Sequence, residues 1–202
     1  MGNAFLIVVD MQNDFVSGSL GTPEAQAIVE AVAQRASSFS GTVVFTKDTH
    51  GSDYATTQEG RNLPIPHCIA GTTGWELAPA LETVRTHRSA PVFEKPSFGS
   101  LDLARWLVAQ NNAAPIDSIE LCGLCTDICV VSNALRLRGW RGRKREGTPT
   151  AKEPQLVKNI NNNESSKEDT AMKKTITIKG MMCAHCVSHV EKALAALGVQ
   201  AD

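Results

Sequence analysis

The sequence predicts an α/β fold in which helices cover both faces of a parallel sheet. Three observations support this prediction. Short apolar runs alternate with longer amphipathic stretches over residues 1–139 of the 202-residue chain. The amphipathic stretches begin at residues that commonly cap helices, and the apolar runs are short enough to be strands. Alternation of this kind is typical of a Rossmann-like, three-layer arrangement with a central parallel sheet.

Four strands are predicted, each from a short run of β-branched or apolar residues. The runs cover residues 5–9, 42–46, 91–94 and 118–121. Nearly continuous apolar runs are typical of strands that are buried on both faces of a parallel sheet. We therefore expect helices on both sides of each of these strands.

Three helices are predicted between and after the strands. Thr22 is a suitable N-cap, and Pro23 occupies the first helical position, where its missing N–H is not needed. Ser100 can cap a second helix. Thr126 or Asp127 can cap a third. The apolar residues along the second and third helices are Leu101, Ala104, Leu107, Val108, Val130, Ala134 and Leu137.

Composition excludes several classes of function. The formal net charge is -1, so no overall charge draws the chain to nucleic acid or to an anionic membrane. No apolar run approaches the roughly 18 residues that cross a bilayer. Residues 1–10 lack the basic start of a secretory signal. We expect the six cysteines to be reduced thiols and the location to be cytoplasmic.

The chain changes character after residue 139. Residues 140–172 contain a cluster of Arg and Lys followed by a stretch rich in Asn, Ser, Glu and Lys, and we interpret them as a linker or disordered segment. The basic cluster is interpreted as a solvated tail rather than a nucleic-acid contact, because no aromatic residue is interleaved beyond Trp140. The resulting division is a domain at 1–139, a linker at 140–172 and a small unit at 173–202.

Polar and reactive residues follow every predicted strand. Asp10 ends the first strand, Asp48 and His50 follow the second, Lys95 ends the third, and Cys129 comes after the fourth. Ligands of open α/β sheets bind outside the carboxyl ends of the strands. We therefore expect these side chains to meet at one edge of the sheet.

Cys129 is the candidate nucleophile. It lies in the first turn of a predicted helix, where the helix dipole and a nearby Lys95 would lower the pKa of the thiol. Asp10 could accept the thiol proton. The alternative for Cys129 is a buried small hydrophobe, for Asp10 a strand-end cap, and for Lys95 a solvated surface residue.

Three motifs resemble the isochorismatase-like cysteine hydrolases. Residues 8–15 read Val-Val-Asp-Met-Gln-Asn-Asp-Phe, residues 94–98 read Glu-Lys-Pro-Ser-Phe, and residues 122–130 read Cys-Gly-Leu-Cys-Thr-Asp-Ile-Cys-Val. Their order and spacing are similar to those of the family. The resemblance implies Cys129 as the nucleophile and Asp10 and Lys95 as its catalytic partners, with Cys125 as a packing side chain.

The resemblance carries further implications for the site. It implies a cis peptide between Leu124 and Cys125, and an oxyanion hole formed by the backbone N–H groups of Cys125 and Cys129. We expect Phe15, and Leu20 from the same motif, to contact the substrate. The implied reaction cleaves a small amide to the acid and ammonia through a thioester. Nicotinamide is the first choice of substrate, and other small amides or an isochorismate-type vinyl ether stay open. The family also implies a possible homo-oligomer.

Asp48, His50 and His67 form a predicted metal site. Two imidazoles and one carboxylate leave positions open for water and substrate, which suits Zn²⁺ or a similar divalent ion. Asp48 and His50 lie two residues apart, and Asp53 and Glu59 lie between them and His67 as possible further ligands. The arrangement resembles the metal site of nicotinamidases. The alternative is a pair of loop histidines that bind nothing.

The C-terminal unit resembles a different family. Residues 180–186 read Gly-Met-Met-Cys-Ala-His-Cys, between a strand-like run at 175–179 and an amphipathic helix. This pattern is similar to heavy-metal-associated domains and implies that Cys183 and Cys186 bind Cu(I) or another soft ion. Only a β-α fragment of that ferredoxin-like fold is expected here.

The two resemblances suggest a hydrolase domain that lacks its C-terminal strand or strands, joined to part of a second protein. One interpretation is that a frameshift or assembly error joined two neighbouring genes, and the alternative is a genuine fusion. The function alternatives to the hydrolase are accordingly a soft-metal binding module and an inactive, truncated chain.

Overall fold

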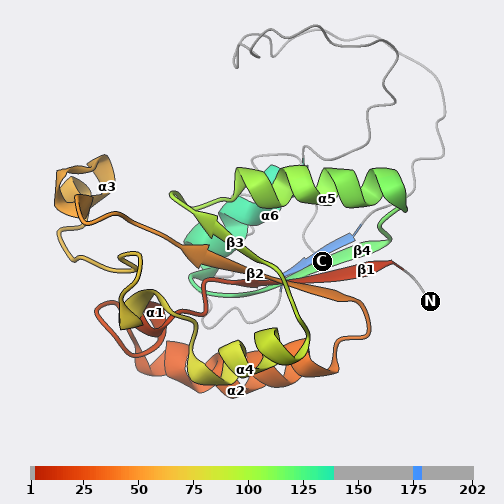
Figure 1. The fold of residues 1–202 in the computed structure, drawn as a ribbon, viewed down its shortest axis with the longest axis horizontal. Coiled ribbons are helices and arrows are strands. Elements are labelled where there is room, and N and C mark those ends of the chain that lie inside the picture. Colours follow the sequence, from red (N-terminus) through yellow and green to blue (C-terminus); the bar gives the residue numbers. More distant parts are fainter. Residues whose placement is uncertain (1–2, 139–174, 179–202) are drawn as a thin grey trace, which may run out of the picture.

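A central parallel sheet separates two layers of helices (Figure 1). The computed structural model describes residues 3–138 and the backbone of a strand at 175–178. Within these residues the predicted α/β class and the placement of helices on both faces are confirmed. None of the helices in these ranges combines the length and the apolar character that crossing a membrane requires.

The sheet contains five strands in the order β3-β2-β1-β4-β5 among the described residues. Their bounds are Ala4–Val9 (β1), Thr42–Asp48 (β2), Val92–Lys95 (β3), Ser118–Gly123 (β4) and Thr175–Ile178 (β5). Every neighbouring pair is parallel. The four strands predicted in the first 139 residues are therefore confirmed, each with ends within two residues of the expected positions. β1 lies in the middle and is covered on both faces.

The edge beside β4 differs from the expectation of a missing strand. The run at 175–179 is predicted to belong to a separate fragment, but Thr175–Ile178 pairs in parallel with β4, from Ser118↔Thr175 to Leu121↔Ile178. This pairing supplies backbone partners to an edge that would otherwise expose unpaired N–H and C=O groups. The other residues assigned to the linker at 140–172 and to the unit at 173–202 lie outside the described residues.

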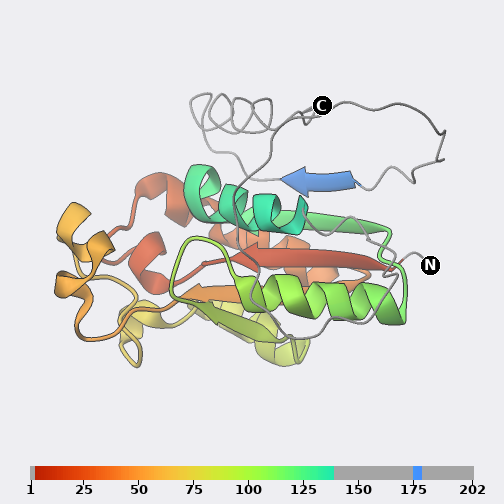
Figure 2. The ribbon, with the colours of Figure 1, turned by 90° about the horizontal axis from the view of Figure 1, so that it is seen from above.

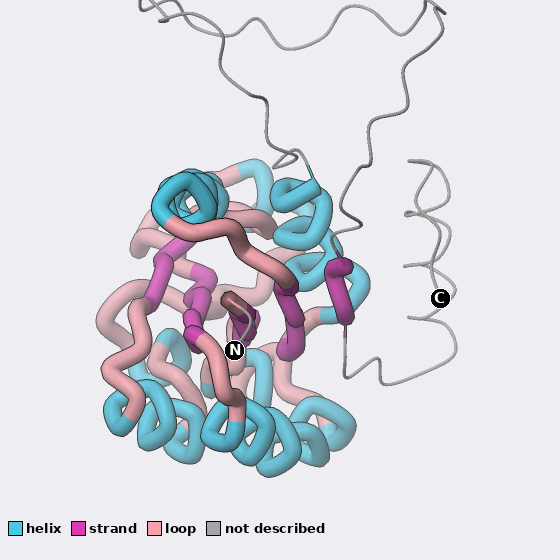
Figure 3. The backbone as a smooth tube through the Cα atoms, turned by 90° about the vertical axis from the view of Figure 1, so that its right-hand side faces the viewer, coloured by secondary structure: helices cyan, strands magenta, loops and turns pink. Residues whose placement is uncertain are grey.

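Helices pack on both faces of the sheet. Figure 3 views the molecule from the side and shows the strands between two groups of helices. α2 and α4 cover one face, and α5 and α6 cover the other (Figures 1 and 2). The α-helices are α1 (Asn13–Val16), α2 (Pro23–Ser38), α3 (Gln58–Asn62), α4 (Pro79–His87), α5 (Leu101–Ala113) and α6 (Val131–Arg138).

Two of the three predicted helix caps are confirmed. The Thr22 side chain accepts a hydrogen bond from Ala25 N at 3.1 Å, and the Ser100 side chain accepts one from Leu103 N at 3.1 Å. The third prediction is wrong, because the turn Thr126–Val130 begins after Cys125 with no side-chain cap. This turn is a π-helix that begins at Thr126, so Thr126 is a buried residue of the turn and not the cap before it.

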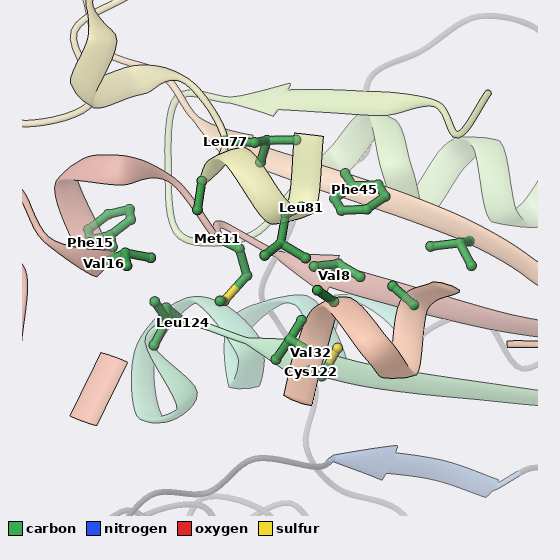
Figure 4. Packing of buried hydrophobic residues seen from close by; sticks show 14 of the residues in the cluster. Val8, Met11, Phe15, Val16, Val32, Phe45, Leu77, Leu81, Cys122 and Leu124 are labelled. Carbon is green, nitrogen blue, oxygen red and sulfur yellow. The ribbon is translucent and has the colours of Figure 1, made fainter. Parts of the chain in front are cut away.

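The hydrophobic core has one part on each side of the sheet. Leu6 and Val8 of β1 face the layer of α2 and α4, whereas Phe5, Ile7 and Val9 face the layer of α5 and α6. Alternate residues of a strand point to opposite faces, so the central strand contributes to both parts. Figure 4 shows the first part, where Val32 and Leu81 of the helices pack near Val8, Met11 and Cys122.

We predict that two leucines of α5 differ in their contribution to stability. Leu103 is fully buried against the sheet, whereas Leu101 is 53% exposed two residues earlier in the same helix. Leu103→Ala should lower the free energy of unfolding by about 2–5 kcal/mol, because it leaves a cavity. Leu101→Ala, the matched control, should change it by less than about 0.5 kcal/mol. Denaturant unfolding of the full chain measures both, and equal losses would contradict the packing of α5.

Candidate active site

Four polar side chains meet at the carboxyl edge of the sheet. Asp10 follows β1, Asp48 ends β2, Lys95 ends β3, and Cys129 lies in the turn after β4. β2 and β3 are in register so that Asp48 and Lys95 are direct partners. Parallel strands end at the same edge, and the chain brings residues from four distant segments to one place for that reason.

Lys95 is the centre of this cluster. Its Nζ lies 2.7 Å from Asp10 Oδ2 and 3.0 Å from Asp48 Oδ1. It also donates a hydrogen bond to Cys129 Sγ at 3.6 Å. Lys95 is 1% exposed and Asp10 is fully buried, so water does not screen these contacts. The structure thus brings together the carboxylate, ammonium and thiol that the sequence analysis selects.

Asp10 is held by a residue that the sequence analysis did not select. Thr46 of β2 donates its hydroxyl to Asp10 Oδ1 at 2.7 Å, and Asp10 N donates to Thr46 O at 3.3 Å. Asp10 itself adopts a left-handed backbone, with φ of 49°. Its Oδ2 accepts no hydrogen bond of standard geometry within the described part of the chain, and its short contact is the ion pair with Lys95. This oxygen therefore keeps a lone pair that can accept a proton.

Burial controls the ionisation of the cluster. It raises the pKa of the Cys129 thiol well above its ordinary value, and the Asp10 carboxylate raises it further, while Lys95 acts in the opposite direction. Burial also raises the pKa of Asp10, opposed by Lys95 and supported by Asp48. For Lys95, burial acts to lower the pKa, but the charges of Asp10, Cys129 and Asp48 outweigh it and the pKa is raised.

The expected low pKa of Cys129 is therefore corrected. The expectation rests on the helix dipole and Lys95, which favour a thiolate, but burial of that charge acts against it. Cys129 is 5% exposed, so the loss of hydration exceeds the attraction of Lys95. Burial therefore favours the protonated thiol of Cys129, and Lys95 acts in the opposite direction.

The turn that carries Cys129 has a defined backbone. The peptide between Leu124 and Cys125 is cis, as the family resemblance implies. Cys129 O accepts a hydrogen bond from Asn133 Nδ2 at 2.8 Å, and Asn133 Oδ1 accepts one from Ser100 N at 3.0 Å. Asn133 thus connects the nucleophile turn to the start of α5, a role that the sequence analysis did not find.

The remaining described cysteines pack in the core. Cys68 and Cys122 are buried, and Cys125 is half-buried against the same hydrophobic part as Cys122. None of the described cysteines is in a disulfide. The second predicted metal site, Cys183 and Cys186, lies outside the described residues, so Cu(I) binding stays a prediction from sequence.

A second cluster of ligand-type side chains lies beside the first. Ligand atoms of Asp48, His50, Glu59 and His67 all lie within 4.8 Å of one another. His50 Nε2 is 2.9 Å from Asp48 Oδ2, and His67 Nε2 is 3.7 Å from both Asp48 Oδ2 and Glu59 Oε1. The three residues predicted as metal ligands are thus adjacent, and Glu59 joins them.

The donor set fits a divalent metal ion. His67 Nδ1 hydrogen-bonds Ile65 O at 2.8 Å, which leaves Nε2 as the acceptor nitrogen that faces the other three side chains. Two imidazole nitrogens and two carboxylates are a common ligand set for Zn²⁺. Asp48, His50 and His67 are buried, so the cluster is pre-formed inside the protein.

Asp48 belongs to both clusters. Its Oδ1 contacts Lys95 and its Oδ2 contacts His50. Burial alone would raise the pKa of Asp48, but the hydrogen bond to His50 and the charge of Lys95 outweigh it and lower the pKa. The same hydrogen bond raises the pKa of His50 against the effect of burial. The candidate metal centre and the thiol site therefore share one carboxylate.

The two predicted substrate contacts differ in position. The Phe15 ring is 5.5 Å from the His67 ring between centroids, so it borders the metal-ligand cluster. Leu20 packs against the hydrophobic part of the core that contains Phe15. Tyr54 was missed by the sequence analysis, although its ring lies 4.9 Å from His50 and 5.1 Å from His67. It is the chain's single tyrosine, four residues after His50.

Comparison with known protein families identifies a matching domain. The family profile described as the isochorismatase domain matches residues 4–139. The matched range includes both clusters of side chains at the sheet edge and ends before the segment that contains Cys183 and Cys186.

Individual relatives agree with this match. A nicotinamidase/pyrazinamidase of Mycobacterium tuberculosis is 31% identical over 146 residues, which are 64% of this chain and 75% of the relative. The crystal structure of pyrazinamidase of Pyrococcus horikoshii in complex with zinc is 28% identical, with a TM-score of 0.54, over 68% of this chain and 79% of that one. PnC1 from L. infantum in complex with nicotinate is 26% identical, with a TM-score of 0.58, over 68% of this chain and 75% of that one.

We predict that Lys95 is required for the site to remain folded. Lys95→Met should lower the free energy of unfolding by about 3–5 kcal/mol, because it leaves the carboxylates of Asp10 and Asp48 buried without their shared cation. Arg105→Ala, which removes a cation from an exposed ion pair with Asp102, should leave stability close to that of the wild type. Denaturant unfolding compares the two variants, and a Lys95→Met chain as stable as the wild type would contradict the central role of this ammonium.

Proposed function

Because the chain belongs to the isochorismatase family, we propose that it is a cysteine hydrolase that cleaves a small carboxamide, such as nicotinamide, to the acid and ammonia. The observation that carries the proposal is the buried contact of Lys95 with Asp10 and Cys129. Relatives named nicotinamidase or pyrazinamidase support the substrate class, and a structural relative in complex with nicotinate supports a pyridine carboxylate as the product.

Cys129 acts as the nucleophile in this proposal. As its sulfur forms a bond to the amide carbon, the thiol proton moves to Asp10 Oδ2 and the carbonyl electron pair moves to oxygen. The raised pKa of both groups favours this coupled transfer over a resting thiolate, because neither charge is stable alone in the buried site. Lys95 remains positively charged and offsets the negative charge as it moves from Asp10 to the substrate.

The tetrahedral intermediate then breaks down to a thioester. The backbone N–H groups of Cys125 and Cys129 are the proposed donors to its oxyanion. The carbon–nitrogen bond breaks, Asp10 returns its proton to the leaving nitrogen, and ammonia departs. Water next attacks the thioester while Asp10 accepts one of its protons. The carbon–sulfur bond then breaks, Asp10 gives this proton to the departing sulfur to restore the Cys129 thiol, and the acid is released.

Asp48, His50, Glu59 and His67 are the proposed holders of a divalent metal ion, with zinc as the first choice. When bound, such an ion supplies Lewis acidity and positive charge beside the thiol site. Phe15 borders the same cluster and offers an aromatic surface to a flat substrate ring. The zinc complex of the Pyrococcus horikoshii relative supports the choice of metal.

We predict that Cys129→Ala lowers ammonia release from nicotinamide by about a thousandfold or more, because no other described thiol lies at the Lys95–Asp10 pair. Cys122→Ala is the matched control, since it removes a buried thiol on β4 outside the site. It should keep most of the wild-type rate. Hydroxylamine added during turnover should yield the hydroxamate only with an intact Cys129. Wild-type turnover in Cys129→Ala would overturn the nucleophile.

We also predict that the full chain binds about one zinc ion at the cluster of Asp48, His50, Glu59 and His67. The measurement uses a background with Cys183→Ser and Cys186→Ser, so that the C-terminal thiols do not contribute. His67→Ala should lose most of the binding in competition with a chromophoric chelator, because it removes a buried ligand nitrogen. Undiminished zinc affinity in His67→Ala would refute the ligand assignment.

A further inference from the structure

We propose that Asp14 is a positioning residue for the metal centre, which orients His67 by holding the peptide N–H of Cys68. The inference rests on the metal site of the proposed function and concerns a residue outside it. Asp14 lies in α1, and His67 lies in a loop more than 50 positions later in the chain. Asp14 is neither part of the thiol cluster nor one of the four ligand-type side chains.

The contact between Asp14 and the loop is direct. Cys68 N donates a hydrogen bond to Asp14 Oδ2 at 2.7 Å. This N–H belongs to the peptide bond that joins His67 to Cys68, so the hydrogen bond fixes the plane of that peptide and the direction in which the His67 side chain leaves the backbone. Cys68 also has a φ of 48°, a left-handed conformation that a residue with a side chain rarely adopts without support.

The next peptide unit, which joins Cys68 to Ile69, bonds to the residue that carries the other imidazole. His50 N donates to Cys68 O at 3.0 Å, and Ala70 N donates to His50 O at 2.9 Å. The backbone of Cys68 therefore lies between Asp14 on one side and His50 on the other. Fixing this residue sets the separation of the His50 and His67 rings, whose centroids are 5.0 Å apart.

Two glycines lie directly against the Asp14 carboxylate. A methyl group on Gly74 would collide with the Asp14 carboxylate, and one on Gly18 would approach Asp14 Oδ1 to 2.5 Å. The absence of a side chain at both glycines therefore leaves room for Asp14. Substitution of either glycine would displace the carboxylate from Cys68 N.

Residues 12–14 hold the connection between β2 and α4 at three points. We call these three residues the loop clamp. Gln12 Nε2 donates to Trp75 O at 2.8 Å, Asn13 Nδ2 donates to Thr73 O at 2.8 Å, and Asp14 accepts from Cys68 N. Gln12 and Asn13 hold the part of this connection that lies just before α4. Asp14 holds Cys68, the residue after His67. His67 lies outside the strands, so the hydrogen bonds of the sheet do not fix it as they fix Asp48 in β2.

The test measures zinc affinity by chelator competition, in the full chain with Cys183→Ser and Cys186→Ser. Asp14→Ala should weaken zinc binding about tenfold or more, as is typical for loss of a group that orients a ligand. Asp14→Asn should stay within about threefold of the wild type, because its amide oxygen can accept the same N–H. Asp102→Ala, which removes a carboxylate of equal charge at a 72% exposed position on α5, should leave the affinity unchanged.

A second variant separates positioning from folding. Gly74→Ala keeps Asp14 but pushes its carboxylate away from Cys68 N, so it should weaken zinc binding in the same way even if Asp14→Ala fails to fold. Thermal unfolding of the metal-free chains should show much smaller changes than the zinc affinity does. Wild-type zinc affinity in both Asp14→Ala and Gly74→Ala would overturn the inference, as would an Asp14→Asn chain as weak as Asp14→Ala, which would assign the effect to charge.

The two proposals fail in different ways. A wild-type chain that binds no zinc, or a His67→Ala chain that binds it as well as the wild type, removes the metal site and the role of Asp14 with it. Loss of zinc in His67→Ala with no change in Asp14→Ala and Gly74→Ala removes the positioning role alone.

Discussion

The candidate site depends on one buried ammonium group. Lys95 Nζ contacts two carboxylates and a thiol that come from β1, β2 and the turn after β4, and all of these groups are almost fully shielded from water. Two carboxylates cannot both remain ionised in such a place without a cation between them. The position of Lys95 at the end of β3, in register with Asp48, is therefore what allows the Asp10 carboxylate to lie beside the Cys129 thiol.

The shared carboxylate of Asp48 joins two kinds of chemistry. One oxygen contacts Lys95 and the other contacts His50, so the thiol cluster and the metal-ligand cluster lie next to each other. A small amide bound between them would place its carbonyl carbon near Cys129 and its ring near Phe15 and the metal ligands. This proximity explains how one edge of a sheet can hold a substrate and supply its nucleophile from different strands.

The metal-ligand cluster relies on irregular structure as well as on strands. Asp48 lies in β2 and is fixed by the hydrogen bonds of the sheet, and Glu59 lies in the short helix α3, but His67 lies in the loop between α3 and α4. A loop has no repeating hydrogen-bond ladder, so it needs contacts from elsewhere to keep its ligands in place. The loop clamp formed by residues 12–14 supplies such contacts shortly after Asp10 in the chain.

The amino-acid sequence by itself determined the features that depend on local order. The four strands of the first 139 residues and the caps at Thr22 and Ser100 follow from apolar periodicity and from short-range hydrogen bonds. The convergence of Asp10, Asp48, Lys95 and Cys129 also follows, because parallel strands end at one edge. Tertiary structure alone decided the raised pKa of Cys129, the place of Tyr54 beside the histidines, the uncapped turn at Thr126 and the pairing of Thr175–Ile178 with β4. Each of these depends on burial or on contacts between distant segments, and no local pattern of residues records how deeply a group is buried or which distant neighbour it meets.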